Sequence, residues 1–205
     1  MTNKAPVFEK IVEDYLLQIA AHEAKEEVAQ SLEIDVADGR YRIPFFHRAY
    51  MIGTDRIVDA DGKPATHLVS VVLCKYLLLC PNLPSGGVDL VTYKDFKDAA
   101  PFVGGFRNTV EKPFARNFEH SLPLLEKRCL ELGGRFFDTE VSCQLSFRFN
   151  ALPKVPVVLL FNDADEDFPA QATFLFQKNA ASFLDMECLA MIGGALAYNL
   201  QEMKI

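Results

Sequence analysis

The residues that decide the fold read VSCQLSFRF, from Val141 to Phe149. Apolar side chains take every second place in this run, and polar or charged ones take the places between them. Successive side chains of a β-strand point to opposite faces, so the alternation predicts a strand with one buried face and one wet face. The rest of the molecule is expected to be built around this strand.

Two further strands follow. Val155–Phe161 is apolar throughout, which is typical of a central strand buried on both faces. Ala172–Gln177 returns after the acidic loop Asn162–Pro169, so three antiparallel strands are expected. Together with the helices on either side, they predict an α+β fold in which an antiparallel sheet of three to five strands packs against several helices.

A long apolar helix is expected after the sheet, over Ala180–Leu200. Its interior holds Gly193 and Gly194, and each glycine lowers helix stability by about 1 kcal/mol relative to alanine. Close packing along a stripe of small residues would offset this loss, and the stripe expected is Ala190, Gly194 and Ala197. That packing is expected within the subunit, and a homodimer contact is the alternative.

Helices are also expected before the sheet. Ala65–Cys80 predicts a mostly apolar helix that Pro81 ends, and Val88–Tyr93 predicts a short extended segment. Residues 95–132 predict several shorter helices, followed by a stop at Gly133-Gly134. The residues expected to interrupt a single long helix are Gly104, Gly105, Pro113 and Pro123. An apolar ridge is expected from Phe106, Val110, Phe114 and Phe118, which recur at every fourth position.

The N-terminal part predicts one helix and one strand. A helix over residues 8–31 mixes apolar and charged side chains, so it is expected to be partly solvated and peripheral. From Arg40 the pattern changes to period two, and a strand is expected to run as far as Ile52. The whole chain, residues 1–205, is expected to form a single domain.

Composition excludes several classes of protein. A formal charge of −7 argues against general binding to nucleic acid, because the chain repels a phosphate backbone. The longest apolar stretch, Leu68–Cys80, is shorter than the roughly 20 residues that a bilayer-spanning helix needs. The N-terminal apolar run Tyr15–Ala21 lacks the basic start of a signal peptide. The five cysteines show no CxxC spacing, and reduced thiols in the cytoplasm fit them best.

The acidic loop is the first candidate site. Asp163, Asp165 and Asp167 alternate along it, and carboxylate oxygens are the ligands that hard divalent cations prefer. A calcium loop would also need a glycine at its sixth position and a glutamate at its twelfth, where this chain has Phe168 and Phe174. A solvated hairpin tip is therefore the competing interpretation. A divalent cation is the one cofactor that the sequence leaves open.

Two histidines suggest a ligand site. His47 is followed by Arg48, a pair suited to binding an anion, with a solvated strand face as the alternative. His67 opens the apolar helix, where a buried imidazole needs partners and a capping role is the alternative. Glycine-rich phosphate loops and a nucleophile elbow are absent from the sequence. The seventeen phenylalanines either line an apolar pocket or fill the core.

Five short motifs, taken in order, resemble a known family. They are Val91–Phe96, Gly133-Gly134, Leu152–Val157, Asp165–Ala170 and Phe174–Phe176. The chain is similar to an uncharacterised bacterial and archaeal domain-of-unknown-function family that is common in anaerobes. The resemblance implies no activity or catalytic residue. Some relatives are associated with iron–sulfur or corrinoid-linked proteins, which implies an accessory role beside a partner that carries such a cofactor.

Two functional hypotheses follow. The first is a non-catalytic binding or accessory module in anaerobic metabolism, with a protein partner or a small ligand, because no complete catalytic constellation stands in the sequence. The second is a divalent-metal-dependent enzyme that uses carboxylates of the 163–167 loop with His47 or His67. Whether the chain is an enzyme is left open.

Overall fold

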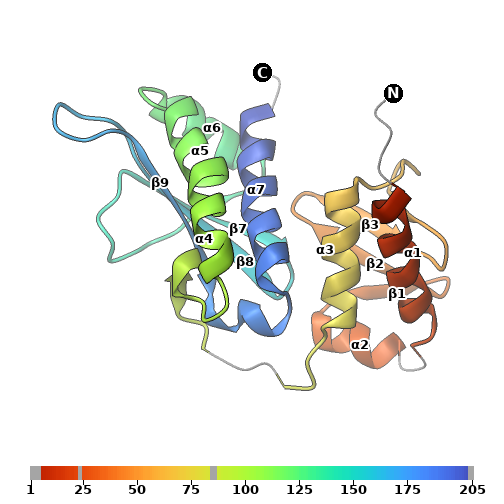
Figure 1. Cartoon of the computed structure of the whole chain (residues 1–205). Helices are drawn as coiled ribbons and strands as arrows, with labels where there is room; N and C mark the ends of the chain where they lie inside the picture. The colour runs from red at the N-terminus through yellow and green to blue at the C-terminus, as the bar shows by residue number, and fades with distance from the viewer. Residues whose placement is uncertain (1–5, 23–24, 84–86, 203–205) are drawn as a thin grey trace.

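The computed structural model of the chain describes residues 6–22, 25–83 and 87–202. These residues form two antiparallel sheets, one of four strands and one of five, with helices beside each. The α+β class predicted from the sequence is therefore confirmed. Figure 1 shows the N-terminal half, up to helix α3, beside the C-terminal half that holds the five-stranded sheet.

The five-stranded sheet has the order β5-β9-β8-β7-β6. Its strands are β5 (Leu90–Thr92), β6 (Arg135–Phe136), β7 (Leu145–Leu152), β8 (Val155–Asn162) and β9 (Gln171–Gln177). Strand β8 lies between β7 and β9 and is buried as far as Phe161, which confirms the central strand predicted. Strand β7 begins later than the alternation from Val141 suggested. The preceding segment instead crosses the outer face of the sheet, where Phe137 and Cys143 pack against buried strand residues.

Helices cover the other face of this sheet (Figure 1). They are α4 (Ala100–Phe106), α5 (Lys112–Asn117), α6 (Leu122–Glu131) and α7 (Met186–Glu202). The expected break at Gly104-Gly105 is wrong, because α4 runs through both glycines and continues into a π-helical turn, η2 (Arg107–Glu111), and then α5. The π-turn widens the helix just before Pro113, whose ring would clash with the preceding turn of a regular α-helix.

The predicted aromatic ridge holds the helical layer on the sheet. Phe106, Phe114 and Phe118 are buried, and Phe114 makes edge-to-face contacts with Phe161 and Phe174. The close contact on α7 involves Gly193 rather than the predicted Gly194. A Cβ atom at Gly193 would lie 2.6 Å from the Phe106 ring, so only glycine fits there. This contact lies within the subunit.

The four-stranded sheet is a meander in the N-terminal half. Its strands are β1 (Asp35–Ala37), β2 (Arg40–Phe45), β3 (Arg48–Ile52) and β4 (Ile57–Asp59), and its helices are α1 (Pro6–Ala20), α2 (Lys25–Leu32) and α3 (His67–Leu78). The single strand predicted over 40–52 is wrong, because the chain turns back at Phe46-His47. The pattern of buried positions changes at this turn. Odd-numbered residues such as Ile43 are buried in β2, whereas even-numbered residues such as Ile52 are buried in β3.

The helix predicted over residues 8–31 is also wrong as a single peripheral element. The chain leaves the helix after Ala20 and enters α2 at Lys25, and residues 23 and 24 lie outside the described part. Leu16 and Ile19 of α1 are buried, as is Leu32 of α2, so both helices belong to the core. The apolar stripe fades because α1 ends at Ala20, not because a longer helix becomes solvated.

The two halves share hydrogen bonds as well as apolar contacts. Phe46 N–H donates to the Ala151 carbonyl at 2.9 Å, which joins the β2–β3 turn to β7. The Tyr76 hydroxyl of α3 donates to the Leu32 carbonyl at 3.1 Å and accepts from Lys154 N–H at 3.1 Å. Burial raises the pKa of this hydroxyl above its usual range. In the part of the chain that the structure describes, no helix is long and apolar enough to cross a membrane.

Candidate functional site

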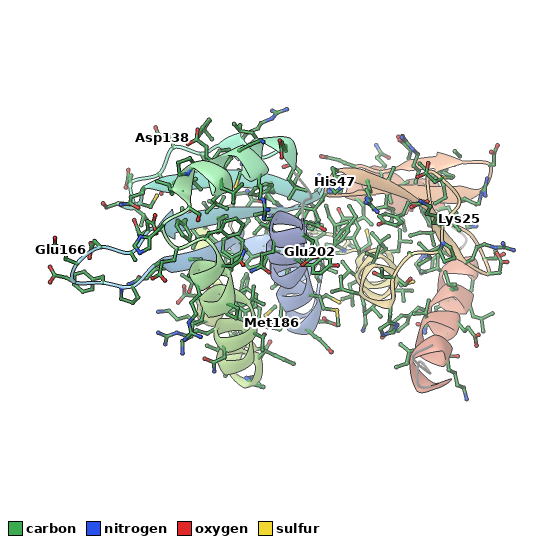
Figure 2. The ribbon with its side chains drawn as sticks, turned by 90° about the horizontal axis from the view of Figure 1, so that it is seen from above. Lys25, His47, Asp138, Glu166, Met186 and Glu202 are labelled. Atoms are coloured by element: carbon green, nitrogen blue, oxygen red, sulfur yellow. The ribbon has the colours of Figure 1, made fainter. Side chains whose placement is uncertain are left out.

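The tip of the β2–β3 hairpin is held in a strained conformation. Phe46 has φ +52°, the left-handed region that bulky side chains adopt rarely. Its hydrogen bond to Ala151 and its edge-to-face contact with Phe45, at 4.9 Å between ring centroids, keep it there. Strained backbone of this kind persists where tertiary contacts over-determine it, and it clusters at functional sites. The turn carries His47 to the junction between the halves, as Figure 2 shows.

A cleft of about 450 Å³ opens beside this turn. Its volume lies within the roughly 300–1,000 Å³ that is usual for small-molecule sites. The lining residues come from three segments: the hairpin tip, the turn after α6, and the paired strands β6 and β7. They are Phe46, His47, Leu132, Gly133, Arg135, Arg148, Phe149 and Asn150. The cleft therefore exists only once the two halves have come together.

Two arginines dominate the charge of the cleft. Arg135 and Arg148 are directly opposite each other in the β6–β7 ladder, so their side chains share a face. The next pair, Phe136 and Phe147, stacks at 4.4 Å between centroids. Both arginines are exposed, and neither has an ion pair or hydrogen-bonded partner among the residues described. Like charges placed directly across a ladder destabilise a sheet.

His47 adds a third polar group. The Nε of Arg48 donates a hydrogen bond to His47 Nε2 at 3.3 Å. Partial desolvation and then the nearby Arg48 charge lower the pKa of His47, which favours the neutral imidazole. Arg48 does not line the cleft itself, and it instead holds the imidazole by donating to it. The structure thus places His47 in the lining of the same cleft as Arg135 and Arg148, with Arg48 beside it, and anion binding by the His47–Arg48 pair stays a prediction.

These groups suit a small organic anion. A guanidinium presents its N–H donors as a planar fork that matches a carboxylate or a phosphate group. The Asn150 amide adds hydrogen-bonding capacity, and the half-buried ring of Phe46 supplies an apolar surface beside the cations. The cleft can thus bind both an anionic head group and a flat or apolar body.

His67 is placed elsewhere. It is the first residue of α3, next to Thr66, whose hydroxyl accepts a hydrogen bond from Val69 N–H at 3.4 Å. His67 has an interaction of its own, and it does not line the cleft that holds His47. The structure therefore does not bring the two histidines into one pocket.

The acidic loop uses its carboxylates on its own backbone. Asp163 accepts hydrogen bonds from His120 N–H at 2.7 Å and Ala164 N–H at 2.8 Å. Asp165 accepts from Asp167 N–H at 2.9 Å and Phe168 N–H at 2.7 Å, a turn closed by a side chain. Within residues 6–22, 25–83 and 87–202, no three His, Cys, Asp or Glu side chains are arranged to hold a metal ion. The metal ligation predicted for Asp163, Asp165 and Asp167 stays a prediction.

A second acidic turn, at Asp59–Asp61, also uses a carboxylate to accept backbone hydrogen bonds. Asp59 accepts from Asp61 N–H at 3.0 Å and from Lys63 N–H at 2.9 Å, so its carboxylate closes the turn that follows β4. All five cysteines are free thiols, and Cys74, Cys129 and Cys188 are buried. Burial raises the pKa of the Cys74 thiol to about 12, which keeps it protonated and unreactive.

Sequence reasoning missed Arg135, Arg148 and Asn150. The alternating pattern of the sequence places Arg148 on the polar face of its strand. No feature of the sequence indicates that Arg135 lies opposite it in the neighbouring strand. Gly133 has φ +83°, and Gly134 lies so close to Phe149 that a Cβ would fall 2.6 Å from its ring. This glycine turn directs the chain from α6 onto β6 and so sets the position of Arg135.

Comparison with known proteins gives a family and no activity. No curated protein matches the chain, and no solved structure does. A family model described as a domain of unknown function, DUF3786, matches residues 24–199, which is most of the chain. The chain therefore belongs to the DUF3786 family, an uncharacterised domain family of the kind that its ordered motifs indicated.

Proposed function

We propose that this chain is a binding module whose cleft takes a small organic anion bearing a phosphate or carboxylate group. The observation that carries the proposal is the Arg135–Arg148 pair, two cations placed opposite each other with no anionic partner among the described residues. Such a pair lowers the stability of the protein without a ligand. An anion bound between the two guanidinium groups would turn this repulsion into a net attraction.

The charge of the whole protein limits what the cleft binds. The net charge of −7 repels extended polyanions, so the local cationic group is suited to a compact ligand. The volume of about 450 Å³ supports the same size class. The half-buried Phe46 ring favours a ligand with an apolar or flat body rather than an inorganic ion alone.

The cellular setting is part of the proposal. Free cysteines support a reducing compartment such as the cytoplasm. The sequence motifs support an accessory role in anaerobic metabolism of bacteria or archaea, beside a protein partner that carries an iron–sulfur or corrinoid cofactor. Gly193 is used for packing inside the subunit, so the small-residue stripe gives little support to a homodimer. The metal-dependent enzyme is the weaker candidate, because Asp163 and Asp165 already accept backbone hydrogen bonds.

The experiment titrates the protein calorimetrically with inorganic phosphate and with an aromatic phosphomonoester at constant ionic strength. The phosphomonoester is expected to bind at least tenfold more tightly than phosphate, because only its aromatic ring can pack against Phe46. An Arg135→Gln, Arg148→Gln variant is expected to lose about 100-fold or more in affinity, since each charge-assisted hydrogen bond contributes roughly 1.5–3 kcal/mol.

The matched control is Arg56→Gln, Arg116→Gln, which removes the same charge from exposed positions that do not line the cleft. This control is expected to bind as tightly as the wild-type protein. If neither anion binds the wild-type protein, or if both double variants lose affinity equally, the proposal is overturned.

A further inference from the structure

A second hollow region lies along the first half of β9, away from the cationic cleft. It consists of two adjoining cavities of about 380 and 310 Å³, which share Arg107, Glu111, Gln171 and Thr173. One wall is the π-turn η2, and the other is β9 with the segment Thr92–Lys94. Figure 1 shows this place, where the green α4–α5 helix lies beside the blue β9 strand.

The hollow exists because two regular elements are interrupted there. Strand β5 pairs with β9 along Leu175–Gln177, and among the described residues no strand pairs with the first part of β9 on that side. The π-turn widens the helix opposite this open edge and turns both Arg107 and Glu111 toward it. Single π-turns within α-helices are frequent at functional sites.

Three charged groups converge on this space. The Glu111 carboxylate is half-buried and lies near the Phe174 backbone in β9. Burial raises the pKa of Glu111, against the opposing effects of the Phe174 backbone, Arg107 and Lys94. Arg107 and Lys94 stand near the carboxylate, yet neither forms an ion pair within 4.0 Å among the residues that the structure covers.

Two other charged side chains of the region, Asp95 and Lys112, already have hydrogen-bond partners. Asp95 accepts from the Thr92 backbone N–H at 2.9 Å and from its hydroxyl at 2.6 Å. Lys112 donates to the Asn108 side chain at 2.9 Å. One carboxylate and two cations are thus left facing the cavity.

The floor of the cavity is apolar and rigid. Val103, Phe106 and Tyr93 line it, and the rings of Phe106 and Tyr93 lie 4.6 Å apart between centroids. The Tyr93 hydroxyl donates to the Met186 carbonyl at 2.7 Å, so it anchors the floor and is not available to a ligand as a donor. A short apolar side chain would find a surface there.

We propose that this cavity is a binding site for a free α-amino acid, whose carboxylate lies on Arg107 and Lys94 and whose ammonium group lies on Glu111. The ligand's two charges match the separated charges of the site. The ammonium would compensate the half-buried carboxylate, and the carboxylate would fill the guanidinium fork. With two cations and one anion the site carries a net charge of +1, so an amino acid with an acidic side chain is expected to bind more tightly than a neutral one.

The test is calorimetric titration of the whole chain with glutamate, alanine, propionate and alaninamide. Alanine is expected to bind at least tenfold more tightly than propionate, which lacks the ammonium group, and than alaninamide, which lacks the carboxylate. Glutamate is expected to exceed alanine. Equal binding of propionate and alanine would mean a plain anion site and would sink the proposal, as would the absence of binding by both amino acids.

Glu111→Gln separates ligand binding from folding. Glutamine has the same size and keeps one side-chain oxygen beside the Phe174 backbone, so the melting temperature is expected to stay unchanged while the affinity for alanine falls at least tenfold. Glu119→Gln, at an exposed position outside the cavity, is the charge-matched control and is expected to bind normally. Undiminished binding by Glu111→Gln would overturn the proposal.

A second variant keeps the test decisive if Glu111→Gln folds poorly. Arg107→Gln changes an exposed side chain and is expected to lose alanine affinity at least tenfold. The Arg135→Gln, Arg148→Gln protein is expected to bind alanine normally, because those residues line the other cleft. Loss in this last protein and retention in Arg107→Gln would place the amino acid in the cationic cleft and refute the second site.

Discussion

The acidic loop and the cationic cleft each concentrate charge of one sign, but the two regions treat that charge differently. In the loop, Asp163 and Asp165 each accept two backbone hydrogen bonds from residues that shape the loop and its neighbour. In the cleft, Arg135 and Arg148 face each other without a described partner. A carboxylate that accepts backbone hydrogen bonds supports structure, whereas two like charges opposite each other in a ladder are what a bound anion would stabilise.

Their positions reinforce this difference. Figure 2 shows Glu166 at the far tip of the loop, projecting from the C-terminal half, and His47 where the two halves meet. A projecting tip can satisfy its charges with water and its own backbone. At the junction, by contrast, partial desolvation lowers the pKa of His47.

Arg148→Glu gives the largest expected effect and tests the cleft directly. The new carboxylate would face Arg135 across the ladder and occupy it as a ligand would, so binding of a phosphomonoester is expected to fall about 100-fold or more. The same pair is expected to raise the free energy of unfolding by roughly 0.2–1 kcal/mol. Calorimetry and urea unfolding measure the two quantities. Weaker binding accompanied by lower stability would contradict the explanation.

Asp163→Ala probes the loop and is expected to act on stability alone. The change removes the acceptor for His120 N–H and Ala164 N–H, so the free energy of unfolding should fall by about 1–2 kcal/mol. Glu166→Ala, at the exposed tip of the same loop, is the control and is expected to change it by less than about 0.5 kcal/mol. Equal effects of the two substitutions would mean that Asp163 has no structural role.

A metal titration tests whether the carboxylates of the acidic loop bind a ligand after all. If the loop binds a divalent cation, millimolar calcium, magnesium or manganese should raise the melting temperature, and an Asp165→Ala, Asp167→Ala variant should lose that rise. The hydrogen bonds of Asp165 predict little or no shift in either protein. A cation-dependent rise in the wild-type protein only would establish the loop as a metal site.

The smallest expected effect concerns His47 and pH. Because desolvation and Arg48 lower its pKa, the folded protein binds the proton less readily than the unfolded chain does. Protonation of His47 therefore lowers the free energy of unfolding as the pH falls below the ordinary histidine pKa of about 6.5. Above that pH, His47 has no such effect. A bound anion should raise the pKa of His47 toward or beyond the ordinary value. Histidine NMR titrations with and without phosphate measure this, with His120 as the reference.

Several predictions from the sequence were confirmed because their cause is local. The apolar run Val155–Phe161 indicated a central strand, and β8 is one. The four-residue spacing of Phe106, Phe114 and Phe118 indicated a buried ridge, and all three are buried. Gly133 ended a helix as expected, with the positive φ that glycine tolerates best.

The errors share a cause as well. The turn at Phe46-His47 contains no glycine, asparagine or aspartate, so the sequence holds none of the residues that predict a hairpin turn there. It forms because Phe46 N–H binds Ala151, a residue remote in sequence. The expected stop at Gly104-Gly105 failed for a related reason, since packing of Phe106 against Gly193 holds the helix together there.

The sequence by itself determined the α+β class, the central strand and the aromatic ridge. These features depend on the spacing of apolar residues along the chain, which the sequence contains directly. Only the tertiary structure decided the cleft, because Arg135 meets Arg148 through strand register and His47 reaches them through contact between the two halves. Register and contact between distant segments depend on the packing of the whole chain, and no local spacing records them.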